Sequence, residues 1–218
     1  MEIERLADFF DRPEMVEDYV REYRKESVNL NLINSIKPNK IVLSLGCGAG
    51  REVRALIKNG HDITALDISR EQVESSKKLN PKVKHLCIEA IEYAKQNRGK
   101  IKFDYILGLY SLLNYISYED IDEFIRNLMS MLDKDGEAIF EVRMAGENWK
   151  SFLKILIAPI YASKFMAEWK FGEVYSKDPY SLNRMLKSYL FTKRQLNKLF
   201  KDYKFNIKGT IVRVKNKE

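Results

Sequence analysis

Hydrophobic positions in the first two thirds of the chain alternate between short apolar runs and stretches with helical spacing. The apolar runs cover residues 41–45, 62–66, 83–87, 103–109 and 138–142. Apolar residues recur three and four positions apart in 13–36, 51–58, 69–79, 90–96 and 118–132. The runs predict buried strands and the spaced stretches predict helices. Their alternation predicts an α/β fold, a doubly wound and mostly parallel sheet with helices on both faces.

The alternation stops in an aromatic-rich insertion, residues 144–190, which has no regular strand or helix pattern. It resumes at 192–203, where helical spacing returns, and 205–214 then predict one or two closing strands around Gly209. We therefore expect one domain in four parts: an N-terminal helical segment (1–38), a βα core (39–143), the insertion (144–190), and the last helix with the closing strands (191–218).

A glycine-rich turn follows the first predicted strand and is the strongest candidate for a binding site. Residues 43–50 read LSLGCGAG, and a predicted helix begins directly after them. In a doubly wound sheet, ligands bind beyond the carboxyl ends of the strands, and glycine lets the backbone approach them closely. Asp67 ends the second strand 21 residues after Gly46, where a carboxylate can accept both ribose hydroxyls. A dinucleotide fingerprint would need glycine at position 51, which is Arg51, so we expect another nucleoside cofactor.

Several segments, in this order along the chain, resemble those of class I (Rossmann-like) S-adenosylmethionine-dependent methyltransferases. The segments that carry the resemblance are 43–50, 65–69, 89–90, 103–109, 135–137 and 191–205. The resemblance covers about residues 30–143 and 191–214. It implies a methyltransferase enzyme with S-adenosylmethionine (SAM) as its cofactor.

The resemblance also implies a set of cofactor contacts. In it, the glycine turn passes under the methionine part of SAM, and the Leu109 carbonyl accepts from the methionine ammonium. Asp67 takes the ribose hydroxyls, while Ile68 packs on the adenine and the Glu89 carboxylate accepts from its amino group. The full set is Ser44, Gly46, Cys47, Gly48, Gly50, Asp67, Ile68, Glu89, Ala90 and Leu109.

One residue of this set departs from the family pattern. The family usually has Asp or Glu where this chain has Ser44. The substitution removes a carboxylate near the cationic end of the cofactor. We therefore expect either weaker binding or a charge supplied from elsewhere in the chain.

The catalytic residues are less well defined by sequence. The sulfonium methyl is already activated, and holding the acceptor close and aligned can be worth about 7–11 kcal/mol. His61 and His85 fall away from the catalytic edge of the sheet, and the two Cys and two His lack metal-ligand spacing, so no metal is expected. A general base for an oxygen acceptor stays unassigned. The candidates at the correct edge are Tyr110, Asn114, Tyr115, Glu141 and Arg143.

The charge is distributed unevenly. The chain has a net charge of +7, while residues 143–218 alone carry 17 Lys/Arg against 6 Asp/Glu, a net of +11. This excess suits an anionic substrate or surface.

We favour a small-molecule acceptor, and both anionic and lipid-like molecules are possible acceptors. An RNA methyltransferase that uses the basic third for phosphate contacts is an alternative. The segment that begins at Leu109 lacks the Asn/Asp-Pro-Pro-aromatic motif of base methylation. A catalytically silent cofactor-binding subunit is the third reading.

The insertion occupies the place where the family usually carries substrate-side insertions. Its aromatic residues favour a lid, and contact of 149–170 with a membrane surface is the alternative. The longest charge-free hydrophobic stretch, 155–163, is far shorter than the ~20 residues of a membrane span. The first 20 residues have no apolar run, hence no secretory signal, and we expect a cytoplasmic protein of unknown oligomeric state.

Overall fold

A seven-stranded sheet forms the centre of the protein in a computed structural model, which describes residues 2–3, 5–145, 153, 156–159, 173–177 and 184–217. The strand order is β4-β3-β2-β5-β6-β10-β9, and β10 is antiparallel to both of its neighbours while the other pairs are parallel. The strands are β2 (Ile41–Leu45), β3 (Asp62–Asp67), β4 (Lys84–Cys87), β5 (Phe103–Gly108), β6 (Leu132–Glu141), β9 (Lys204–Lys208) and β10 (Ile211–Lys215). The predicted fold class is confirmed.

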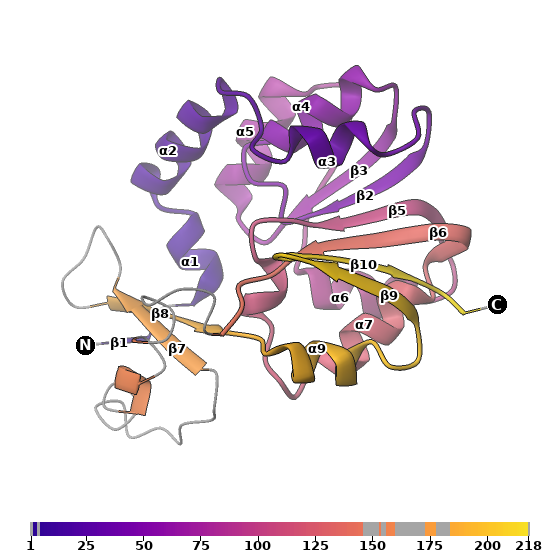
Figure 1. Ribbon diagram of the computed structural model, residues 1–218. Coiled ribbons are helices and arrows are strands. Elements are labelled where there is room, and N and C mark those ends of the chain that lie inside the picture. The colour runs from indigo at the N-terminus through magenta and orange to yellow at the C-terminus, as the bar shows by residue number, and fades with distance from the viewer. Residues whose placement is uncertain are drawn as a thin grey trace.

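Helices cover both faces of this sheet (Figure 1). The helices α3 (Leu30–Asn34) and α4 (Arg51–Lys58) pack on one face, and α6 (Ala90–Asn97), α7 (Ile121–Met129) and α9 (Lys193–Leu199) pack on the other. Alternation along β2 explains the two layers, because Val42 belongs to the first core and Leu43 to the second. The helix α5 (Arg70–Leu79) contacts β3 and β4.

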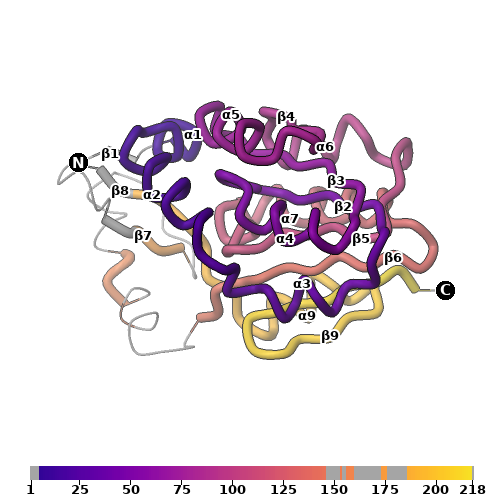
Figure 2. The backbone as a smooth tube through the Cα atoms, turned by 90° about the horizontal axis from the view of Figure 1, so that it is seen from above, coloured from indigo at the N-terminus to yellow at the C-terminus, as the bar shows by residue number. Residues whose placement is uncertain are grey.

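The N-terminal segment and part of the insertion form a second, smaller sheet. The strand β1 (Glu2–Ile3) pairs in parallel with β8 (Arg184–Tyr189), and β8 pairs antiparallel with β7 (Glu173–Lys177). Two further helices, α1 (Leu6–Phe10) and α2 (Pro13–Tyr23), connect β1 to α3. Figure 2 shows the small sheet and the N-terminus at one end of the molecule and the C-terminus at the other. The pattern in 144–190 did not predict these strands.

The expected lid and membrane-contact segment lies almost entirely outside the described residues. Trp149 and Trp169 are among the residues that are not described, and within 149–170 the description is limited to Leu153 and 156–159. Both readings of this segment therefore stay predictions.

Several predicted boundaries were wrong. The helix expected over 118–132 is α7 and is shorter at both ends. The Ser117 hydroxyl accepts from the Asp120 N–H at 3.1 Å, which makes a turn of the residues before the helix. After the helix, Leu132 pairs with Phe103 and starts β6, six residues earlier than expected. A register shift in that pairing lets Asp135-Gly136 lie inside the strand.

The remaining boundaries differ less. The helix expected over 192–203 ends at Leu199, and it begins with a complete capping box between Thr192 and Gln195. The closing strands are two, β9 and β10, joined at Gly209. Ser69 is the N-cap of α5, and its hydroxyl accepts from the Gln72 N–H at 3.1 Å.

We predict that truncating Ile125, which is 1% exposed on α7, destabilises the protein much more than the same change at Ile57, which is 38% exposed on α4. Ile125→Ala removes packing from the larger core and should cost about 2–5 kcal/mol of unfolding free energy. Ile57→Ala should cost less than about 1 kcal/mol. Equilibrium urea denaturation measures both, and equal losses would contradict the assigned core.

Candidate functional site

A cavity of about 440 Å³ lies at the carboxyl ends of the parallel strands, under α1 and α2. This is the edge where ligands bind in a doubly wound sheet. Its wall contains most of the predicted cofactor residues: Gly46, Cys47, Gly48, Asp67, Ile68, Glu89, Ala90 and Leu109. These residues follow β2, β3, β4 and β5, so the fold brings together segments that are up to 63 positions apart.

The glycine turn after β2 takes a conformation that side chains resist. Gly46 and Gly48 have φ values of 63° and 52°, in the left-handed region that favours glycine. A Cβ on Gly48 would lie 2.6 Å from Cδ1 of Tyr19, whose ring comes from α2 and also lines the cavity. Gly48 is therefore needed both for the turn and for the close approach of α2.

Asp67 is the polar centre of the wall. Its Oδ2 accepts from the Gly48 N–H at 2.8 Å, and its Oδ1 accepts from the Ser69 N–H at 3.0 Å. Burial raises the pKa of Asp67 above its ordinary value, while these backbone donors act in the opposite direction. A buried carboxylate with lone pairs left for a ligand suits the two hydroxyls of a ribose.

The other two members of the predicted set, Ser44 and Gly50, lie behind the cavity wall. Ser44 is buried in β2, between Ala65 of β3 and Leu107 of β5. Gly50 is the N-cap of α4, and a Cβ there would lie 2.4 Å from the side chains of both Asn80 and Ser76. Neither is among the described residues that line the cavity, so the structure gives them supporting positions.

Burial also rules out a reactive Cys47. The thiol is buried in the wall, and burial raises its pKa well above the ordinary value. It stays protonated at neutral pH, and a protonated thiol is a poor nucleophile.

Of the five catalytic candidates, Tyr110 and Tyr115 line the cavity. The Tyr110 hydroxyl donates to Glu52 Oε1 at 2.6 Å and accepts from Arg51. Burial and the contact with Glu52 raise the pKa of Tyr110 to about 12. Tyr110 therefore keeps its proton at neutral pH, which does not suit a general base.

The other three candidates, Asn114, Glu141 and Arg143, form hydrogen bonds with segments next to the cavity. Asn114 lies in the short 3₁₀ helix η1 (Leu112–Tyr115), donates to the Arg143 and Tyr189 carbonyls, and accepts from the Arg143 N–H at 2.8 Å. Glu141 accepts from the Tyr110 N–H at 2.9 Å. None of these three is among the described residues that line the cavity, so their positions are structural.

Arg143 stacks its guanidinium over the Tyr115 ring, 5.4 Å from the ring centroid. Its Nε and Nη2 are buried and have no hydrogen-bond partner among the described residues. The stacking is of the cation–π type.

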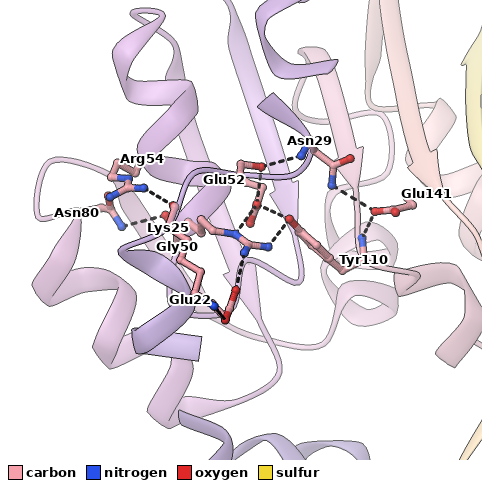
Figure 3. A network of polar contacts seen from close by, with 11 residues as sticks. Glu22, Lys25, Asn29, Gly50, Glu52, Arg54, Asn80, Tyr110 and Glu141 are labelled. Carbon is pink, nitrogen blue, oxygen red and sulfur yellow. Dashed lines mark hydrogen bonds and ion pairs between the residues drawn. The ribbon is translucent and has the colours of Figure 1, made fainter. Parts of the chain in front are cut away.

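Besides tyrosines, six polar residues of the wall were not predicted as site residues: Glu22, Arg51, Glu52, Gln72, Ser117 and Asp120. Arg51 pairs with Glu22 at 3.1 Å and with Glu52 at 3.0 Å, and Figure 3 shows this network between α2, α4 and Tyr110. Gln72 is 1% exposed, and its amide nitrogen and oxygen have no partner among the described residues. Arg51 and Glu52 directly follow the glycine turn, and this position in the sequence could have predicted them as site residues. No sequence feature marks Glu22 or Gln72 as part of the site.

Most of the remaining wall is apolar. It includes Leu6, Phe10, Leu112, Tyr115, Ile116 and Tyr189, from α1, the η1 region and β8, and Ser117 and Asp120 lie beside them. The Phe10 ring meets Tyr19 and Tyr115 edge-on, at centroid distances of 6.1 and 6.2 Å. The residues around the ends of β2, β3 and β4 thus form a polar half of the cavity, and those from α1, the η1 region and β8 form a mostly apolar half.

Neither histidine is among the described residues that line the cavity. His61 accepts from the Lys40 N–H at 3.2 Å, and the His85 ring bonds the Ser76 hydroxyl at 2.8 Å. Among the described residues, no group of three or more His, Cys, Asp or Glu could hold a metal ion. No described helix is both long and apolar enough to cross a membrane.

The wall fits SAM. Its glycine turn leaves a cradle without Cβ atoms, Asp67 presents a buried carboxylate, and Gln72 offers an unpaired buried amide. Together with the strand order, this site defines the class I SAM-dependent methyltransferases.

The central part of the chain is similar to that class. Residues 43–138 match a family model described as a methyltransferase domain. SAM is the cofactor of the class, and the similar structure of a magnesium protoporphyrin IX methyltransferase contains it.

Individual relatives are distant in sequence. Ubiquinone biosynthesis O-methyltransferase of Bradyrhizobium diazoefficiens is 23% identical over 147 residues, which are 67% of this chain and 54% of that protein. The chain thus matches about half the length of this curated relative.

Solved structures share the fold. A SAM-dependent methyltransferase of Methanosarcina mazei is 14% identical with a TM-score of 0.69, over 86% of this chain and 98% of that one. Magnesium protoporphyrin IX methyltransferase of Synechocystis PCC 6803, solved with SAM bound, is 14% identical with a TM-score of 0.62, over 97% of this chain and 95% of that one.

We predict that Gly48→Ala costs more stability than Gly99→Ala. Both glycines have positive φ, but a Cβ on Gly99 meets nothing within 4 Å, whereas on Gly48 it meets Tyr19. Gly99→Ala should lose about 1–2 kcal/mol from the backbone conformation alone. Urea denaturation of both variants checks the difference.

The double variant Gly48→Ala/Tyr19→Ala provides the control. Removing the Tyr19 ring should relieve the clash, with a coupling of about 0.5–3 kcal/mol relative to the two single variants. Additive losses would show that Tyr19 does not limit the space at Gly48.

Proposed function

We propose that this protein transfers the methyl group of SAM to a small-molecule acceptor. One observation carries the proposal: the same cavity has a polar half that suits a nucleoside and an apolar half beside it. At about 440 Å³, its volume lies within the ~300–1,000 Å³ typical of small-ligand sites.

The residues of the polar half orient the cofactor. Asp67 accepts hydrogen bonds from the ribose hydroxyls, and Ile68 and Ala90 pack against the adenine. Glu89, at the N-cap of α6, lies on the wall where it can accept from the adenine amino group. When bound, SAM supplies an activated methyl group on its sulfonium.

The apolar half positions the acceptor and excludes water. Phe10, Tyr115 and Tyr189 converge from three separate segments of the chain on the side of the cavity away from the sheet. Because positioning alone can be worth about 7–11 kcal/mol of the barrier, such a wall is sufficient for an acceptor that is already nucleophilic. By their names, the relatives above act in ubiquinone biosynthesis and on magnesium protoporphyrin IX, which supports a small-molecule acceptor here.

The proposal is tested by incubating the protein with methyl-labelled SAM and a cell extract separated into RNA, lipid and small-molecule fractions. We expect label in the small-molecule or lipid fraction. Label confined to RNA would instead support the alternative that uses the basic C-terminal third. Binding of S-adenosylhomocysteine without any labelled product would indicate a silent cofactor-binding subunit, and either result would overturn the proposal.

We predict that Asp67→Ala weakens S-adenosylhomocysteine binding about 10–150-fold, because it removes hydrogen bonds from two ribose hydroxyls to a charged group. Isothermal titration calorimetry measures the change. Asp62→Ala, at the opposite end of the same strand, should leave the affinity unchanged. Undiminished affinity of Asp67→Ala would show that another group binds the ribose.

A further inference from the structure

The cavity has a second polar region besides Asp67. It contains Glu22, Arg51, Glu52 and Tyr110 and lies where β2 and β5 end (Figure 3). We propose that the Glu52 carboxylate binds the α-ammonium group of SAM, with Arg51 and Tyr110 as positioning residues. This inference rests on the proposed function, because it takes the cavity as the SAM site.

The strand order sets the direction in which the cofactor lies. Along the sheet edge the order is β4, β3, β2, β5, with Glu89 following β4 and Asp67 ending β3. A nucleoside held by Asp67 and Glu89 therefore occupies the β3–β4 side. Its 5′ substituent, the amino-acid chain, must extend past the glycine turn towards β5. Glu52 and Tyr110 lie on the wall at that end.

Hydrogen bonds fix the orientation of the Glu52 carboxylate through one oxygen, Oε1, and leave the other, Oε2, without a donor among the described residues. The residue is 9% exposed, and three donors converge on its Oε1: Arg51 Nε at 3.0 Å, and the hydroxyls of Ser27 at 2.8 Å and Tyr110 at 2.6 Å. Among the described residues, none donates to Oε2. That oxygen is not among the buried unpaired atoms of the described residues, and Glu52 is one of the residues that line the cavity.

The backbone at Tyr110 supports the same role. Tyr110 and Ser111 have positive φ values of 51° and 65°, which are uncommon outside glycine. The Tyr110 N–H donates to Glu141 at 2.9 Å, and its hydroxyl donates to Glu52. These bonds hold the chain after β5 against the Glu52 carboxylate, and strain of this kind concentrates at functional sites.

The charges of the region suit a cation. The carboxylates of Glu22 and Glu52 pair with one guanidinium, that of Arg51, and the carboxylate of Glu141 bonds Tyr110 from behind. Lys25 contacts Glu22 at the exposed end of the network. The amino-acid end of SAM carries a sulfonium, an ammonium and one carboxylate, a net charge of +1. Burial strengthens the attraction of a carboxylate for such a cation.

This arrangement also accounts for Ser44. The sequence lacks an acid at that position, and Ser44 lies behind the wall in β2. Glu52, in the first turn of α4 and eight residues further on, places a carboxylate on the wall itself.

The test compares three ligands by calorimetry: S-adenosylhomocysteine, its analogue without the amino group, and 5′-methylthioadenosine, which has no amino-acid end. Glu52→Gln removes the charge and should weaken S-adenosylhomocysteine binding about 10–150-fold, as for hydrogen bonds between charged groups. Its affinities for the other two ligands should stay at the wild-type values. Glu92→Gln, a first-turn glutamate of α6, is the matched control and should change none of the three.

Each outcome decides the matter. Equal losses for all three ligands would show that Glu52 shapes the cavity and does not bind the ammonium group, and unchanged affinity for S-adenosylhomocysteine would exclude any contact. Both results would overturn the proposal. Failure of the wild-type protein to bind any of the three ligands would instead overturn the proposed function. If Glu52→Gln does not fold, Glu52→Asp, which withdraws the carboxylate, should reduce the preference for S-adenosylhomocysteine over its deaminated analogue several-fold, and an unchanged preference would count against the proposal.

Discussion

The site depends first on the hydrogen bonds that the buried carboxylate of Asp67 accepts. One comes from Gly48 in the turn after β2, and the other comes from Ser69 at the start of α5. A carboxylate this deeply buried is costly unless it is paired, so these bonds fix the distance between two neighbouring loops. The Ser69 hydroxyl in turn accepts from the first turn of α5 and donates to the Asp11 carboxylate of the N-terminal segment at 2.6 Å. The sheet edge, the glycine turn and the cover over the cavity are thus joined through one side chain.

The sequence was sufficient for the βα core because its signals are local. The strand Ile41–Leu45 and the helix Arg51–Lys58 were predicted at their observed bounds, since a short apolar run and a 3–4 spacing each contain their own evidence. Errors arose where contacts distant in sequence decide the structure. Leu132 would continue the apolar face of α7, but pairing with Phe103 turns it into the first residue of β6. The pairing of β1 with β8 was missed for the same reason, because its two strands lie far apart in the sequence.

The candidate site shows the same division. Residues that follow strands, such as Asp67 and Leu109, could be placed from the order of elements, and the cavity contains them. The network around Arg51 could not be predicted, because it joins Glu22, Glu52 and Tyr110 through tertiary contacts. Such contacts leave no periodic pattern in the sequence. Asn114 shows the opposite failure. It lies at the correct edge of the sheet, but its side-chain amide forms hydrogen bonds with backbone groups. These bonds connect η1 to β8 and to the segment after β6.

The two halves of the cavity come from different parts of the chain. The nucleoside half is built from turns after β2, β3 and β4, while the apolar half takes Leu6 and Phe10 from the N-terminus and Tyr189 from the insertion. The parallel pairing of β1 with β8 connects the N-terminal segment to the insertion. Both strands belong to the small sheet, separate from the central one. A substitution at Leu6, Phe10 or Tyr189 would therefore change the apolar half of the wall without removing a hydrogen bond that Asp67 accepts. The apolar half can thus vary in sequence while Asp67 and the glycine turn are retained.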